Sequence, residues 1–99
     1  MGGGYVGILS FELHFPESAS LKGKRRFVSS AKAQLQNRFG ATVSEVEHHE
    51  QWQRCGLAMA CAAREVGKLH QLLDDAERWL HGQDWVVARV ERRIVSLEE

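Results

Sequence analysis

Hydrophobic and polar positions alternate near the start of the chain. From residue 9 every second side chain is large and apolar: Leu9, Phe11, Leu13 and Phe15. The positions between them are polar: Ser10, Glu12 and His14. This period of two predicts a half-buried strand over residues 5–15. Pro16 ends the strand, because proline has no N–H group to donate to a neighbouring strand.

Two later segments have a helical period instead. The first apolar stripe predicts a helix from about residue 20 to about residue 39 and consists of Leu21, Val28, Ala31, Leu35 and Phe39. Ser18 or Ser20 can cap its start, and Gly40 can end it. The second stripe predicts a helix that ends at Gly82 and consists of Val66, Leu69, Leu72, Leu73, Ala76, Trp79 and Leu80.

Three further segments have the character of strands. Residues 41–48 favour extended structure, but Val43 and Val46 can share a face only across a bulge, which predicts an irregular edge strand. Residues 55–62 alternate larger side chains with Gly and Ala, which is typical of a closely packed central strand. In the strand over residues 85–95 the alternation predicts two faces, Val86, Ala88, Val90 and Ile94 opposite Val87, Arg89, Glu91 and Arg93.

The order of these elements predicts an α+β fold. Two right-handed βαβ crossovers around one hairpin give a ferredoxin-like βαββαβ sandwich, with an antiparallel sheet in the order 4-1-3-2 and both helices on one face. A length of 99 residues suits one domain, over residues 5–99, after a flexible segment at residues 1–4. Cys55 and Cys61 lie about 20 Å apart on one strand, so we expect two unbridged core thiols.

Charge is distributed unevenly although the formal net charge is zero. No acidic residue occurs between Glu17 and Glu45, and the start of the first helix is strongly basic. Cations there oppose the helix dipole at a cost of about 0.3–1 kcal/mol each, so we expect a phosphate ligand to offset it. The predicted nucleic-acid-binding residues are Lys22, Lys24, Arg25 and Arg26.

The bland alternative for this segment is an ordinary solvated helix face. Lys22, Arg25 and Arg26 fall on the solvent side of the helix, whereas Lys24 points into the apolar stripe. In that alternative Lys24 extends past the end of the sheet or pairs with Glu17.

The sheet face away from the helices is the second candidate surface. It is expected to carry charged and polar residues from two adjacent strands: Glu12, His14, Arg89, Glu91 and Arg93. This face is either solvated or used by a protein partner, including a second copy of the chain in a homodimer. A Glu12 and Glu91 pair could suggest acid–base chemistry, but neighbouring arginines keep carboxylates ionised.

Catalytic and metal chemistry have little support. The chain has no P-loop, GxSxG elbow or CxxC pair, so we expect no enzyme activity and no cofactor. His48 and His49 could join nearby glutamates around a metal, but adjacent residues of an extended segment point to opposite faces, so no metal site is predicted. Trp52 is predicted to be a core or hairpin anchor, with a base-stacking platform as the alternative, and Arg54 is predicted to pair with a glutamate on the sheet face.

Three motifs carry a resemblance to a known family. They are the SerLeuLysXLysArg start of the first helix (residues 20–25), AsnArgPhe (37–39), and GluVal followed by TrpGlnArg (45–46 and 52–54). With them the chain resembles the bacterial YlxP-like family, a domain of unknown function, over about residues 6–94. The resemblance implies a ferredoxin-like fold, no assigned catalytic activity, and genes found among those for translation initiation and ribosome maturation.

Together these features predict a small cytoplasmic accessory protein. No apolar run approaches the roughly 20 residues that cross a bilayer, and the start lacks the pattern of a secretory signal. The expected partner is ribosomal RNA or a ribosomal subunit, bound through the basic helix start. The alternative is a protein-interaction module or homodimer that uses the open sheet face.

Overall fold

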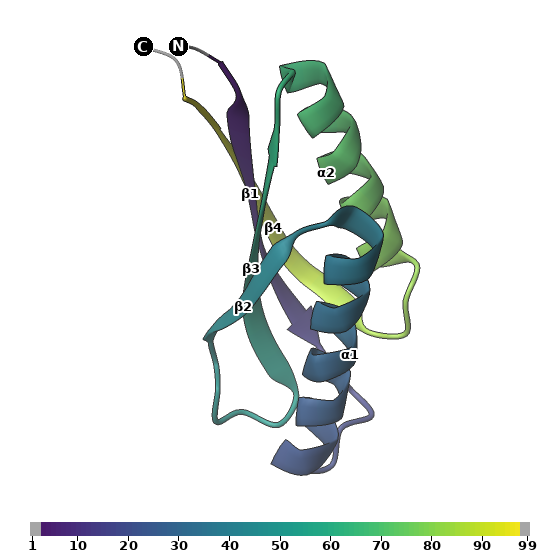
Figure 1. The fold of residues 1–99 in the computed structure, drawn as a ribbon. Helices are drawn as coiled ribbons and strands as arrows, with labels where there is room; N and C mark the ends of the chain where they lie inside the picture. Colours follow the sequence, from purple (N-terminus) through teal and green to yellow (C-terminus); the bar gives the residue numbers. More distant parts are fainter. Residues whose placement is uncertain (1–2, 98–99) are drawn as a thin grey trace.

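The computed structural model describes residues 3–97 and contains six regular elements. In chain order they are β1 (Tyr5–His14), α1 (Leu21–Phe39), β2 (Thr42–Glu47), β3 (Arg54–Ala63), α2 (Val66–His81) and β4 (Val86–Ser96). The strands form one antiparallel sheet in the order β2-β3-β1-β4, and both helices cover the same face (Figure 1). The predicted ferredoxin-like βαββαβ sandwich is therefore confirmed.

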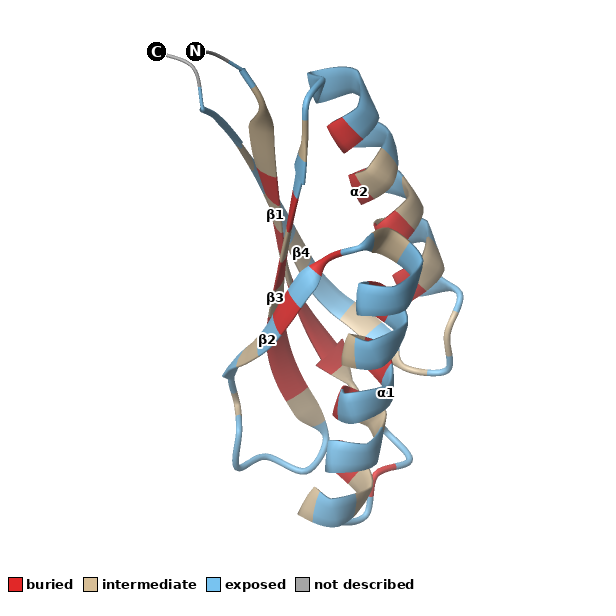
Figure 2. Ribbon diagram, viewed as in Figure 1, coloured by how far each residue is buried: buried red, intermediate tan, exposed pale blue. Residues whose placement is uncertain are grey.

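The core lies between the sheet and the two helices (Figure 2). The alternation of β1 and β3 places one set of side chains under the helices: Leu9, Phe11, Leu13, Cys55, Leu57 and Met59. The helices contribute Val28, Ala31 and Leu35 from α1 and Leu69, Leu73, Ala76 and Leu80 from α2. Both cysteines are free and buried, as predicted.

Local signals determine where α1 begins and ends. The Ser20 side chain accepts a hydrogen bond from the Gly23 N–H at 3.1 Å, which satisfies one free donor of the first turn. Gly40 has the left-handed conformation, with φ 62°, and its N–H donates to the Gln36 carbonyl at 3.0 Å. The predicted cap and stop are therefore both confirmed.

Both edge strands contain an irregularity. The register of β2 shifts between Glu45 and Glu47, as the broken alternation predicted. The register of β4 shifts where it faces Glu12 and Leu13: Leu13 pairs with Val87, but Glu12 pairs with Arg89.

The predicted faces of the last strand are therefore wrong in its first half. Val87 packs against the core, whereas Val86 is 51% exposed and Ala88 is exposed. An extra residue in one strand reverses the side-chain alternation beyond it, and this is why the faces exchange. After the shift, Val90 and Ile94 face the core as predicted.

The first and last described residues lie together at one end of the sheet (Figure 1). Of the segment predicted to be flexible, residues 1 and 2 lie outside the described residues, and Gly4 accepts a hydrogen bond from the Leu97 N–H at 3.0 Å. Among residues 3–97, neither helix has the length and apolar character required to cross a bilayer.

Candidate nucleic-acid interface

Three of the four cations at the start of α1 are exposed on one side of the helix. We call Lys22, Arg25 and Arg26 the α1 basic face. Within residues 3–97 none of their side chains forms an ion pair or a hydrogen bond, and the first turn of α1 contains no acidic residue. A shallow, open depression of about 670 Å³ runs along this face, and Ser29, Ser30 and Ala33 complete its lining. The face is therefore sterically and electrostatically open to an anion.

Lys24, the fourth predicted member, lies on the other side of the helix. Its side chain is 1% exposed, and Nζ lies 3.0 Å from the Glu45 carboxylate of β2. Nζ also donates to the backbone carbonyls of His48 and His49. The ion-pair partner of Lys24 is therefore Glu45, not Glu17 as the solvated-face alternative predicted. Because Lys24 is buried and binds the loop after β2, it is not part of the candidate interface.

The loop that Lys24 holds joins β2 to β3 and spans residues 48–53. It is also fastened to the segment that leads into α1. The Gln53 side chain donates to the carbonyls of Pro16 and Ser18 at 3.2 and 3.1 Å, and the Phe15 N–H donates to the Gln53 carbonyl at 2.8 Å. The start of α1 and this loop therefore form one continuous end of the molecule.

Glu12 is the centre of an ionic cluster on the open sheet face. It is 8% exposed, and its carboxylate accepts hydrogen bonds from His14 Nε2 at 2.7 Å and Arg54 Nε at 3.0 Å. His48 Nε2 lies 3.3 Å from its other oxygen. The hydrogen bond from His14 is the largest cause that lowers the pKa of Glu12. Burial raises this pKa, but Arg54 and His48 lower it again, and the result is about 2. Glu12 is therefore a permanent anion at neutral pH.

The predicted interaction residues of the open face are thus only partly free. Glu12 and His14 belong to the ionic cluster, and Arg54 forms the predicted ion pair with a glutamate. The Arg89 guanidinium, on edge strand β4, lies 3.5 Å from the carboxylate of Glu47, at the end of the opposite edge strand β2. Glu91 and Arg93 are exposed, and neither forms an ion pair within the described part of the chain. His48 could not be assigned to the cluster from sequence, because its contact with Glu12 joins segments that are distant along the chain.

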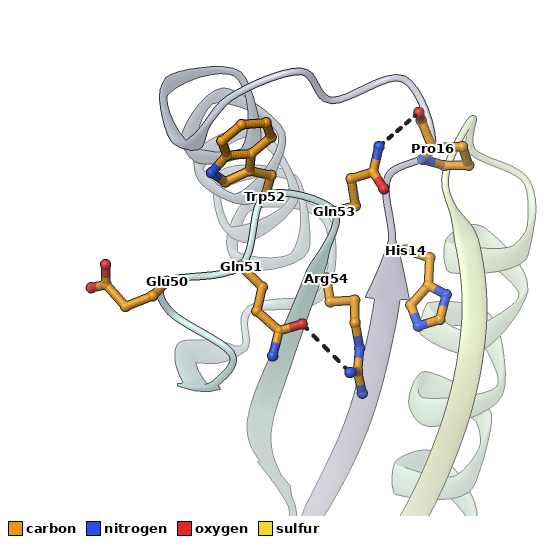
Figure 3. A pocket seen from close by; sticks show the side chains of 7 residues that line it. All are labelled: His14, Pro16, Glu50, Gln51, Trp52, Gln53 and Arg54. Atoms are coloured by element: carbon orange, nitrogen blue, oxygen red, sulfur yellow. Dashed lines mark hydrogen bonds between the residues drawn. The ribbon is translucent and has the colours of Figure 1, made fainter.

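Trp52 does not anchor the hairpin, contrary to the prediction. It is 55% exposed, and among residues 3–97 it makes no stacking contact with another ring. It lines an open pocket of about 770 Å³ together with His14, Pro16, Glu50, Gln51, Gln53 and Arg54 (Figure 3). Its polar sequence neighbours were the available signal, because an anchor inserts into apolar surroundings.

The histidines of the hairpin do not assemble a metal centre. Within residues 3–97 there is no group of three or more His, Cys, Asp or Glu side chains arranged to hold a metal ion. His49 Nε2 lies 3.1 Å from the Glu45 backbone carbonyl, whereas His48 faces Glu12. The Arg54 guanidinium is 3.0 Å from the same carboxylate, and its charge opposes a cation there.

Fold and surface together define a small ferredoxin-like domain with an exposed basic helix face. The chain belongs to a family described as "Protein of unknown function (DUF503)", whose model matches residues 6–94. No curated protein matches the sequence significantly.

Solved structures that match the chain include the following two. The de novo designed protein Foldit4 is 11% identical, with a TM-score of 0.55 over 94% of this chain and 97% of the designed one. A crystal structure from Bacillus cereus, described there as a proposed antibiotic biosynthesis monooxygenase, is 10% identical, with a TM-score of 0.50 over 99% of this chain and 96% of the other. At these identities the likeness shows the fold alone, and fold does not determine function.

Proposed function

We propose that this protein is a non-catalytic cytoplasmic accessory factor that binds the phosphate backbone of structured RNA through the α1 basic face. The expected RNA is that of a ribosomal subunit or its precursor. The observation that carries the proposal is that Lys22, Arg25 and Arg26 are exposed together without a counter-ion among residues 3–97.

Some other cations of the chain have counter-ions, whereas Arg64, Lys68 and Arg93 are exposed without one among residues 3–97. Arg54, Arg78, Arg89 and Arg92 each lie within 3.5 Å of a carboxylate. The chain contains as many acidic as basic residues, yet the first turn of α1 contains no acidic residue. Unpaired cations at a helix N-terminus oppose the dipole, and an RNA phosphate would offset that cost while it neutralises the side chains.

Structured RNA fits this arrangement better than a small anion does. The three cations follow the helix surface for more than one turn and border a shallow depression rather than an enclosed cavity. A shallow positive surface suits an extended row of phosphates, which is contacted from one side. The resemblance of the SerLeuLysXLysArg motif to the YlxP-like family adds support, because that family's genes lie among those for translation.

The test is co-sedimentation with ribosomal subunits over a series of salt concentrations. A variant with Lys22→Glu, Arg25→Glu and Arg26→Glu should lose binding, and the wild-type slope of log K against log salt should include about 2.7 from these three contacts. The matched control carries Arg64→Glu, Lys68→Glu and Arg93→Glu, which change the net charge equally at exposed positions outside α1.

Two results would contradict the proposal. If both triple variants bind as the wild type does, the contact surface lies elsewhere. If both lose binding equally, only net charge matters and the α1 basic face has no special role.

The alternative function is a homodimer or protein-interaction module on the open sheet face. It is favoured by β4, which is an edge strand with Val86 51% and Val95 40% exposed. Sedimentation equilibrium tests it: a dimer that Arg93→Glu weakens, in a protein without affinity for RNA, would favour the alternative over RNA binding.

A further inference from the structure

We infer that this protein pairs with a second copy of itself through an apolar patch on the open sheet face. The open-face patch lies away from the Glu12 cluster and consists of Val6, Ile8, Ala58, Ala60, Ala62 and Val95. The inference goes beyond the proposed function, because both helices lie on the other face of the sheet (Figure 1). The α1 basic face stays free in such a pair, so pairing and RNA binding can coexist.

Strand alternation directs the patch residues away from the core. Leu9 and Met59 are buried under the helices, so Ile8 and Ala60, one position away, face the opposite side of the sheet. All six patch residues keep surface open to solvent among residues 3–97, and Val95 is 40% exposed. Apolar side chains that gather on one surface outside the core indicate an interaction site.

The shape of the patch fits a copy of itself. Ile8 of β1 lies directly opposite Ala60 of β3, and Val6 lies opposite Ala62, so the β1 row stands higher than the β3 row. When two such sheets face each other about a two-fold axis parallel to the strands, β1 of each copy lies over β3 of the other. The high row then enters the low row twice, as in packed sheets whose inner side chains interdigitate. This self-complementarity favours a second copy over an unrelated protein.

The charges of the open sheet face also fit a second copy. The described strands carry three carboxylates and three guanidinium groups on this face: Glu12, Glu47, Glu91, Arg54, Arg89 and Arg93. The face is therefore neutral overall, in contrast to the α1 basic face. Two copies meet there without net repulsion, whereas a polyanion is not attracted.

The edge strands supply polar partners around the patch. The same two-fold axis places β4 of one copy over β2 of the other. In the sheet register Glu91 of β4 is level with Ser44 of β2, and Arg93 is level with Thr42. Across the pair, the Ser44 hydroxyl can donate to the Glu91 carboxylate, and Arg93 can donate to the Thr42 hydroxyl. An apolar centre with a polar rim is the usual anatomy of a protein interface.

The size of the open sheet face suits a dimer. β1 and β3 have ten residues each. Strands of this length span about 33 Å, and four strands side by side span about 19 Å, which gives a flat area of roughly 600 Å². This area is of the same order as the roughly 800 Å² that each partner buries in a standard interface.

The experiment is sedimentation equilibrium of the protein without RNA, from micromolar to near-millimolar concentration. The variant Ala60→Glu places a charge at the centre of the patch, and Ile8→Ala removes the high side chain without adding a charge. The matched control is Ala33→Glu, which adds the same charge at an exposed position of α1. Far-UV circular dichroism and urea unfolding check that each variant folds.

We expect the wild type to reach twice the mass of one chain as the concentration rises. Ala60→Glu should raise the dissociation constant by at least about 30-fold, the loss typical of one central interface residue. Ile8→Ala should raise it by about tenfold, because less apolar surface is buried. Ala33→Glu should leave it unchanged.

The outcomes are independent of the RNA proposal, because no RNA is present. A wild type that stays monomeric at every concentration would overturn the pairing. A dimer that neither Ala60→Glu nor Ile8→Ala weakens would place the contact on another surface and overturn it as well. Equal weakening by Ala60→Glu and Ala33→Glu would show an effect of net charge alone, which also contradicts the patch.

Discussion

The ammonium group of Lys24 lies 3.0 Å from the carboxylate of Glu45, on the helix-facing side of the sheet. The carboxylate oxygen of this pair is buried and accepts no hydrogen bond of good geometry, so the contact is chiefly electrostatic. The same ammonium group holds two carbonyls of the β2–β3 loop. One side chain thus joins α1, β2 and the loop that carries Trp52.

Lys24→Met should destabilise the protein by about 3 kcal/mol, because it leaves the Glu45 charge and two loop carbonyls without their partner. Urea unfolding measures the change in free energy. Lys22→Met is the matched control on the exposed side of the same helix turn, and it should change stability by less than about 0.5 kcal/mol. The double variant Lys24→Met with Glu45→Met should lose less than Lys24→Met alone, because no unpaired charge remains. Equal stability of the two single variants would contradict the structural role of Lys24.

Glu12 should make stability depend on acid pH. Its pKa is about 2 in the folded protein and 4.5 ordinarily, so the unfolded chain binds this proton more tightly. The stability that Glu12 contributes is therefore present above pH 4.5 and is lost as the pH falls from 4.5 towards 2. Glu12→Gln should lower stability at neutral pH and flatten the dependence in that window, as measured by urea unfolding at stepped pH. Glu17→Gln, at an exposed loop position, is the control, and identical profiles for the two variants would argue against the ionic cluster.

The two thiols should be unreactive in the folded protein. Burial is the main cause that raises the pKa of Cys55 to about 12, with a further contribution from Glu45, and burial also raises the pKa of Cys61. Because the thiolate is the reactive species, labelling with Ellman's reagent at pH 8 should be slow and should become complete only in denaturant. Rapid labelling of either cysteine without denaturant would show that β3 is more accessible than the structure indicates.

A pair of glycines should respond to alanine in opposite ways. A Cβ atom at Gly7 would lie 2.8 Å from Leu73 Cδ1 and 3.0 Å from Leu69 Cδ1, so Gly7→Ala should separate β1 from α2 and cost about 1–3 kcal/mol. A Cβ at Gly67 meets nothing within 4 Å, and Gly67→Ala in the first turn of α2 should stabilise by about 0.4–1 kcal/mol. Thermal and urea unfolding measure both, and a neutral Gly7→Ala would contradict the close approach of α2.

Much of the fold could be predicted because its signals are local. The Ser20 cap, the Gly40 stop and the two apolar helix stripes each depend on residues a few positions apart. The bulge in β2 could be predicted from the separation of Val43 and Val46 alone. The bulge in β4 could not, because Val86, Val87 and Ala88 are all apolar and either alternation fits them.

The candidate site could be predicted only in part. The α1 basic face follows from helical geometry, since Lys22, Arg25 and Arg26 lie on one side of any helix that buries Leu21 and Val28. The same geometry places Lys24 inward, but it does not identify Glu45 as its partner. The exposure of Trp52 depends on how the β2–β3 loop is fastened by Gln53, across 35 residues of sequence.

The sequence by itself determined the order of the elements, the helix-facing sides of β1 and β3, and the absence of acidic residues at the start of α1. Each follows from backbone periodicity and local chemistry, which do not require the rest of the chain. Only the tertiary structure decided that Lys24 pairs with Glu45 and binds the loop, and that Trp52 is exposed beside a pocket. It also decided that the Glu12 carboxylate contacts His14, His48 and Arg54. These contacts join segments distant in sequence, and their geometry exists only after the sheet and the helices have packed.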